Sequence, residues 1–155
     1  MRYPVWTGIR FNIMNKILQK EFRVERDDYA NAGMAYSQIK STLKQVGVDP
    51  KVMRRIAVAA YEAEINMIIH AWGGVVYLDV TEDGMIHLIF QDNGPGIPDL
   101  EKAMTPGWST ASKKARELGF GAGMGLPNIK RVSDEFTIES SPAGTSIFLT
   151  FRVEE

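Results

Sequence analysis

The chain has 155 residues, a length typical of one domain that buries about two thirds of its surface on folding. It carries 18 Lys and Arg against 19 Asp and Glu, and the net charge of −1 argues against direct nucleic-acid or membrane binding. There is no cysteine, which excludes disulfides, thiolate catalysis and zinc–thiolate sites. No segment has the length and apolar character of a signal peptide or a membrane span, so we expect a cytoplasmic protein.

The predicted elements begin after an N-terminal extension of unknown role. Residues 1–17 form this extension, and residues 18–155 are interpreted as a single domain. The domain opens with an alternating, charged stretch that predicts an edge strand, followed by two amphipathic helices. In chain order, these elements are Leu18–Arg26, Tyr29–Val46 ended by Gly47, and Pro50 to about Trp72, capped by Asp49.

The next stretch predicts a hairpin whose register depends on its turn. A two-residue Asp83-Gly84 turn would mix apolar and polar side chains on each face. A three-residue turn, with Glu82 added and Gly84 left-handed, places the apolar side chains of both strands on one face. We prefer the longer turn for that reason. In its register Asp92 is in phase with Phe90, points to the apolar side and requires a hydrogen-bond donor.

Glycine is concentrated in the middle of the chain, where seven of the 14 glycines fall between Gly94 and Gly125. Such clustering points to a backbone that approaches a ligand closely or to a loop that moves. A short helix over Leu126–Ser133 and a second hairpin, Asp134–Ser140 with Thr145–Val153, follow. Hairpin strands with helices on one face predict an α+β two-layer sandwich, with a mixed, mostly antiparallel sheet.

The second helix carries the first candidate for chemistry. Glu62 and Asn66 are four residues apart and so share one side of the helix, whereas Glu64 lies two residues from each and cannot join them. An amide oxygen is a ligand for Mg²⁺, and a carboxylate can orient or deprotonate a nucleophile. The alternative is a solvated helix face with a local hydrogen bond.

Two glycine-containing segments carry the second and third candidates. In DNGPGIPD, an adenine amino group would satisfy Asp92, and Gly94 and Gly96 would let a flat ring approach the backbone. An ordinary glycine–proline loop is the alternative. In GFGAGMGLPNIK, alternating glycines run into a helix and expose N–H groups that favour phosphate. A loop with glycine hinges is the alternative there.

The segment Pro106–Gly119 between them has the composition of a lid. Ser109 and Thr110 could donate to phosphate oxygens, although a solvated charged loop is the alternative. Further on, the hydroxyl of Thr145 could help to hold Asp92. The chain has neither a dinucleotide fingerprint, nor a Walker A loop, nor the His-Arg-Asp of protein kinases.

In this order the three candidates resemble the ATP-binding domain shared by DNA gyrase, heat-shock chaperones, sensor histidine kinases and mismatch-repair ATPases, the Bergerat fold. The resemblance covers about Glu21 to Val153 and implies ATP and Mg²⁺, with Glu62 as general base and Asn66 as the metal ligand. Asp92 would bind the adenine amino group. The nucleotide-binding residues it implies are Asn66, Asp92, Gly94, Gly96, Ile97, Ser109, Thr110, Gly121, Gly123, Met124, Gly125, Leu126 and Thr145.

The run EAEINMIIHAW is similar to the box E-A-x-x-N-x-I-x-H of the small anti-sigma-factor serine kinases of bacterial partner-switching systems. The tail GMGLPNIKRVSDEFTIESSPAGTSI looks like the switch-kinase branch of that group. Sensor histidine kinases often carry a basic residue where this chain has Ile69, and no dimerising helix pair with a phosphoacceptor histidine precedes the pattern.

This resemblance implies Mg-ATP-dependent transfer to a serine or threonine of a small antagonist protein, binding of a sigma factor, or both, in a monomer or a homodimer. The alternative is a nucleotide-dependent module that sequesters a regulator without phosphoryl transfer. Glu62 favours the kinase, because a sensor needs no base. Slow ATP hydrolysis coupled to dimerisation, as in the chaperones, is a weaker third reading because no second domain is present to supply a catalytic residue.

Overall fold

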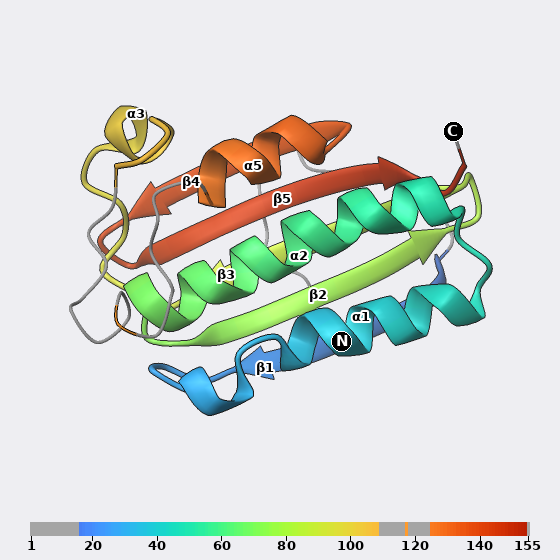
Figure 1. Cartoon of the computed structure of the whole chain (residues 1–155), viewed down its shortest axis with the longest axis horizontal. Coiled ribbons are helices and arrows are strands. Elements are labelled where there is room, and N and C mark those ends of the chain that lie inside the picture. Colours follow the sequence, from blue (N-terminus) through green and yellow to red (C-terminus); the bar gives the residue numbers. More distant parts are fainter. Residues whose placement is uncertain (1–15, 109–116, 118–124, 155) are drawn as a thin grey trace.

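Five strands form one sheet in the order β1-β2-β3-β5-β4 (Figure 1) in a computed structural model that describes residues 16–108, 117 and 125–154. Every pairing among the described strands is antiparallel, so no parallel pair interrupts the sheet there. The strands are β1 (Lys16–Val24), β2 (Gly74–Thr81), β3 (Met85–Asp92), β4 (Glu135–Ser141) and β5 (Gly144–Arg152).

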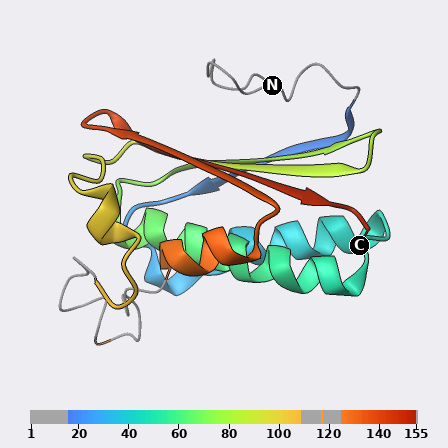
Figure 2. The ribbon, with the colours of Figure 1, turned by 90° about the horizontal axis from the view of Figure 1, so that it is seen from above.

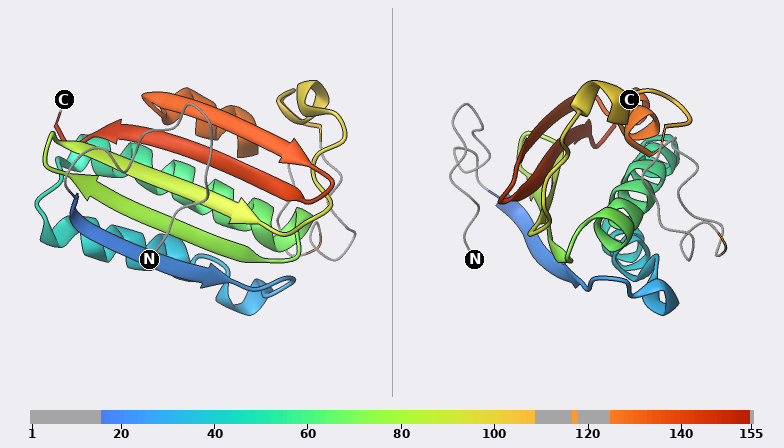
Figure 3. Two further views of the ribbon diagram at one scale, coloured as in Figure 1. Left: turned by 180° about the vertical axis from the view of Figure 1, so that it is seen from behind. Right: turned by 90° about the vertical axis from the view of Figure 1, so that its left-hand side faces the viewer.

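The main helices cover one face of this sheet and form a second layer, as Figures 2 and 3 show. The longest helix, α2, lies between α1 and α5 and packs against both. The described helices are η1 (Tyr29–Asn31), α1 (Met34–Gln45), α2 (Pro50–His70), α3 (Leu100–Ala103) and α5 (Gly125–Val132). The predicted α+β two-layer architecture is therefore confirmed. None of the described helices has the length and hydropathy needed to span a bilayer.

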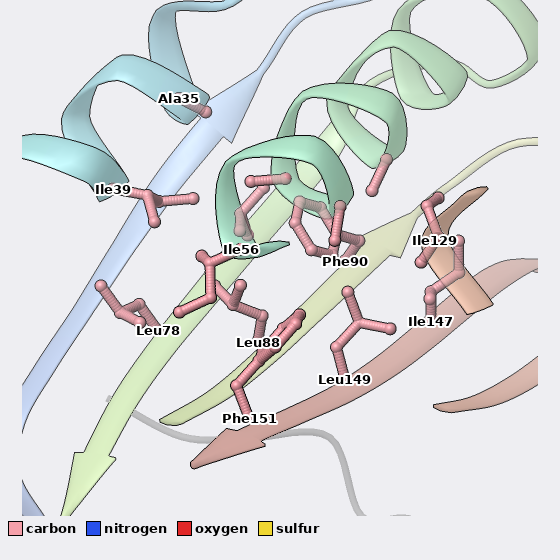
Figure 4. Close-up of a cluster of buried hydrophobic side chains, with 14 of the residues drawn as sticks. Ala35, Ile39, Ile56, Leu78, Leu88, Phe90, Ile129, Ile147, Leu149 and Phe151 are labelled. Atoms are coloured by element: carbon pink, nitrogen blue, oxygen red, sulfur yellow. The ribbon is translucent and has the colours of Figure 1, made fainter. Parts of the chain in front are cut away.

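The core lies between the helices and the sheet. Small and branched side chains of α2, such as Ile56, are fully buried against Leu88, Phe90 and Leu149 of the central strands (Figure 4). At the start of α2, the Asp49 side chain accepts the N–H of Lys51 at 2.8 Å, as the sequence predicted for a cap followed by proline. Burial of these α2 side chains holds the helix against the sheet, and this determines where the side chains on the other faces of α2 point.

The hairpin register agrees with the three-residue turn. Val76 lies opposite Phe90 and Leu78 opposite Leu88, with all four side chains in the core. Gly84 has φ +82°, the left-handed conformation that the longer turn requires. Asp92 consequently belongs to the helix-facing side of the sheet, at the end of β3.

The first predicted helix is interrupted, in contrast to the single helix expected from its periodicity. A 3₁₀ turn precedes Gly33, which has φ +93°, and α1 starts only after this glycine. The helix α2 ends at His70, earlier than expected, because Ala71 is extended. The sequence also gave no sign of α3, or of the placement of β5 between β3 and β4.

Candidate functional site

The structure brings Glu62 and Asn66 of α2 against the first residue of α5. A Cβ atom on Gly125 would lie 3.2 Å from the Glu62 Oε2 and 3.2 Å from the Asn66 Oδ1, so both side chains face this helix start. Glu62 is half-buried, and burial raises the pKa of its carboxyl. A carboxylate with a raised pKa beside an amide oxygen can accept a proton close to a bound metal or anion.

The side chain of Asp92 is held by two backbone groups. Its Oδ1 accepts the N–H of Gly94 at 2.9 Å and the N–H of Thr145 at 3.0 Å. Burial raises the pKa of Asp92, and these two hydrogen bonds oppose the shift. No residue in the described ranges donates to Oδ2. The carboxylate is thus fixed by one oxygen and keeps the other as an acceptor for a ligand.

The hydroxyl of Thr145 has a different partner from the one expected. The sequence pointed to this hydroxyl as a support for Asp92, but the support comes from the Thr145 backbone N–H. The hydroxyl oxygen lies 2.8 Å from Oγ of Ser140, which also accepts the N–H of Ile97 at 2.7 Å. Sequence reasoning missed Ser140, because its role depends on the pairing of β4 with β5.

The glycines after Asp92 are required by the packing of the protein itself. A Cβ on Gly94 would lie 2.8 Å from Cα of Ala71, just beyond the end of α2. Gly96 has φ +85°, and a Cβ there would overlap the carbonyl oxygen of Ser141. The prediction that these glycines let a base approach stays a prediction, since protein contacts alone account for them.

The C-terminal end of α2, the start of α5 and the end of β3 lie at the same end of the molecule, on the left in Figure 1. Gly74 follows α2 closely in the chain and pairs directly with Asp92, and its Cβ position is 2.8 Å from Cε of Met67. The C-terminal half of α2, which carries Asn66, therefore covers the end of the sheet where Asp92 lies.

A buried acid beside this site has a structural role that the sequence did not reveal. Glu64 is 2% exposed, and its carboxylate accepts the N–H groups of Gly33, Ala35 and Tyr36 at 2.8–3.2 Å. It caps the start of α1, where Gly33 offers no capping side chain. As predicted, Glu64 does not join Glu62 and Asn66. The signal for this role in the sequence was a glutamate at a position of α2 that faces the core.

The remaining predicted residues divide into two groups. Leu126 is buried in the core, and Ile97 packs against the core from the loop after β3. The others, Ser109, Thr110, Gly121, Gly123 and Met124, lie outside the described residues.

The residues of this site suit Mg²⁺ only when a phosphate-containing ligand supplies further oxygen atoms. The described residues contain no cluster of three or more His, Cys, Asp or Glu suited to a metal ion. Magnesium is usually held by one or two protein oxygens together with phosphate oxygens and water. The Asn66 amide oxygen beside the start of α5 suits that mode of binding.

Comparison with known families agrees with this geometry. Residues 26–151 match the family model described as the histidine kinase-like ATPase domain. The chain belongs to this family. The match starts within the described part of the domain and ends in β5, so it includes every residue of the candidate site.

Relatives of the chain include proteins from Bacillus species. The chain is 34% identical over 126 residues to the anti-sigma F factor of Bacillus licheniformis, covering 77% of this chain and 83% of that protein. It is 34% identical over 112 residues to the serine/threonine-protein kinase RsbT of Bacillus subtilis, covering 70% and 78% of the two chains.

Two solved structures share the fold at low sequence identity. The RsbU and RsbW domains of Rv1364c from Mycobacterium tuberculosis align with a TM-score of 0.62 at 18% identity, over 87% of this chain and 32% of that longer one. The SiaB–SiaC complex of Pseudomonas aeruginosa contains a chain that aligns with a TM-score of 0.55 at 16% identity, over 89% and 90%.

Proposed function

We propose that this histidine kinase-like ATPase-domain protein binds Mg-ATP and transfers the γ-phosphoryl group to a serine or threonine of a small antagonist protein. The observation that carries the proposal is the position of Glu62 beside Asn66 at the start of α5. The names of its relatives support it, since they include a serine/threonine-protein kinase and anti-sigma F factors. Because it depends on ATP, we place its activity in the cytoplasm.

Each part of the site has a defined task in this proposal. Oδ2 of Asp92 accepts a hydrogen bond from the amino group of adenine, while the two hydrogen bonds to Oδ1 hold the carboxylate in place. The start of α5 at Gly125 offers N–H groups to the phosphates. We propose the same role for Gly121 and Gly123, which lie outside the described residues. Asn66 would hold Mg²⁺, which when bound would neutralise negative charge on the phosphates.

Glu62 acts as the general base for the acceptor hydroxyl. The hydroxyl oxygen forms a bond to the γ-phosphorus while the bond from that phosphorus to the bridging oxygen breaks, and ADP leaves with the bridging electrons. The hydroxyl proton passes to the Glu62 carboxylate, whose burial raises its pKa and so makes it a stronger base. Positioning and charge neutralisation account for the rest of the rate.

The test separates binding from transfer. In Glu62→Gln we expect ATP affinity within about twofold of the parent by calorimetry, and a loss of transfer of about 100-fold or more with radiolabelled γ-phosphate and the antagonist protein. Glu101→Gln, on exposed α3, is the matched control and should change neither. Equal loss of binding and transfer in Glu62→Gln would contradict the role of Glu62 as base.

In Asn66→Ala we expect the Mg²⁺-dependent part of the affinity to disappear.

A second candidate function is sequestration of a regulator, such as a sigma factor, without transfer. The anti-sigma F factors among the relatives favour it. Partner binding that depends on ATP and is unchanged in Glu62→Gln, with no labelled partner from the parent chain, would replace the kinase proposal. Sedimentation of the parent chain with and without ATP decides whether a homodimer takes part.

A further inference from the structure

The outer face of the sheet, on the side away from the helices, is buried along its central strands. Ile89 of β3 and Phe148 of β5 lie opposite each other on this face and are 1% and 3% exposed. Neither belongs to the hydrophobic core between the helices and the sheet. The other buried side chains of the outer face, on β2 and β5, are Asp79, Thr81, Ser146 and Thr150.

Neighbouring side chains within the sheet do not account for this burial. Side chains on one face of a sheet stand side by side, with paired Cβ atoms about 5 Å apart, so they shield each other's flanks more than their tips. The described helices that pack on the sheet, α1, α2 and α5, lie on the other face, as Figures 2 and 3 show. The burial of Ile89 and Phe148 therefore calls for a further layer over the outer face.

The buried area is a strip that follows the three central strands. On the edge strands the same face is exposed, at Gln19 and Glu21 of β1 and at Glu135 and Thr137 of β4. Neighbouring strands lie about 4.8 Å apart, so the buried strip is roughly 10–15 Å wide. A strip of this width suits extended chain, whereas a second sheet packed face to face would extend over the edge strands as well.

The chain enters the sheet beside the buried strip. β1 begins at Lys16, whose ammonium lies 3.1 Å from the Asp79 carboxylate, so the Lys16 side chain is on the outer face. The 15 residues before it could span up to about 50 Å when extended. The buried strip runs for about six residues of strand, or roughly 20 Å, from Thr81 toward Ser146.

The composition of residues 1–15 suits a cover for a buried face. Ile9, Phe11 and Ile13 alternate with polar residues, a pattern that gives one apolar side to an extended segment. The segment contains two arginines and no acidic residue. It would therefore bring no second negative charge to the buried carboxylate of Asp79.

We propose that residues 1–15 pack across the outer face of β2, β3 and β5, so that the chain itself occupies this surface. The N-terminal segment then forms a third layer of the domain and closes the face to a second copy of the chain. The inference is independent of ATP binding, because Asp92 and α2 lie on the other side of the sheet.

The test uses thiol reactivity, since the chain has no cysteine of its own. Ser146→Cys places one thiol in the buried strip, and Thr137→Cys places one on the exposed edge of the same face. In the full chain we expect Ellman's reagent to label Ser146→Cys about 100-fold more slowly than Thr137→Cys, because labelling requires the cover to open. Replacing Ile9, Phe11 and Ile13 together with serine should bring the two rates within about threefold.

Ala59→Cys is the matched control. Ala59 is fully buried on the helix side of the sheet, so its thiol should stay slow to react with and without the three serines. This control separates removal of a cover over the outer face from loosening of the whole domain.

A second measurement leaves residues 1–15 unchanged. A nitroxide on Thr137→Cys should broaden the amide signals of residues 1–15, and a nitroxide on Lys44→Cys, exposed on α1 at the helix side, should broaden them far less. Mixing nitroxide-labelled chains with isotope-labelled chains that carry no nitroxide separates contacts within one chain from contacts between two.

Each contrary outcome overturns the inference. Fast labelling of Ser146→Cys in the full chain means that the outer face is open. Labelling that stays slow with the three serines means that another group covers it. Broadening that appears only between different chains means that a second copy supplies the cover. If the serines also expose the thiol of Ala59→Cys, the nitroxide measurement decides, and unbroadened signals from residues 1–15 overturn the inference.

Discussion

Each face of the sheet carries an aspartate, half-buried Asp92 on one face and buried Asp79 on the other, and the structure holds the two in different ways. On the helix-facing side, Asp92 receives two backbone N–H groups on one oxygen. On the opposite face, Asp79 is 1% exposed, and its described partner is the ammonium of Lys16 at 3.1 Å. The geometry of Asp92 is set by rigid backbone, whereas that of Asp79 depends on a long, flexible side chain.

This difference suits Asp92 to the proposed binding role and Asp79 to a structural one. Asp92 has a fixed orientation with one oxygen left for a ligand, which is the arrangement that recognition of an amino group requires. Neither oxygen of Asp79 has a hydrogen bond from the described residues beyond the ion pair, and burial raises the pKa of Asp79 to about 7. We therefore expect ligand affinity to depend on Asp92, and pH-dependent stability to depend on Asp79.

Substitution of Glu64 is expected to have the largest effect on stability. Backbone N–H groups hold Glu64 as they hold Asp92, but both of its carboxylate oxygens are engaged. Glu64→Ala removes the acceptor from the buried N–H of Ala35 and from the half-buried N–H groups of Gly33 and Tyr36. We expect a loss of about 3 kcal/mol in the free energy of unfolding, measured by guanidinium denaturation. Glu64→Gln keeps one acceptor oxygen and should lose less. A loss below about 1 kcal/mol in Glu64→Ala would contradict this role.

Asp92→Asn tests the binding side of the comparison. The amide keeps an oxygen for the two backbone N–H groups but turns an NH₂ group toward the base, so two donors would meet. We expect ATP affinity to fall about 100-fold, equivalent to about 2.7 kcal/mol, by calorimetry with Mg²⁺ present. Asp79→Asn serves as the control and should bind ATP like the parent. Similar losses in both variants would remove the distinction between the two aspartates.

The smallest effect concerns pH. The folded chain keeps a proton on Asp79 that the unfolded chain releases above its ordinary pKa of 3.8, so the stabilisation from this group is lost as pH rises toward 7. Lys16 opposes the raised pKa, and His87 lies directly across the strand pair from Asp79. Between pH 5 and pH 8 we expect the parent to lose about 2 kcal/mol more unfolding free energy than Asp79→Asn. Parallel pH curves for the two proteins would show that Asp79 does not titrate in this range.

Much of the fold was predictable because its signals are local. The Asp49 cap with Pro50, the register around Gly84 and the helix-facing direction of Asp92 all follow from short-range spacing, and the structure confirms them. The single helix predicted over Tyr29–Val46 was wrong in its first turns, because periodicity does not report that the chain changes direction at a left-handed glycine.

The candidate site was predictable in its residue types more than in its contacts. The spacing of Glu62 and Asn66 places both on one side of a helix, and the structure brings that side to Gly125 of α5. The sequence also showed that Asp92 needed a donor. It did not identify the donors, which are the backbone N–H groups of Gly94, two positions away, and of Thr145, 53 positions further along the chain.

The sequence by itself determined the periodicities, caps and turns that make these helices and hairpins, since each depends on residues a few positions apart. Only the tertiary structure decided that β5 lies between β3 and β4, that Glu64 caps a helix 28 to 31 residues away, and that Ser140 reaches Ile97 across 43 residues. The physical reason is that a hydrogen bond depends on distance and direction in space. Local patterning sets neither for segments that meet only when the core has formed.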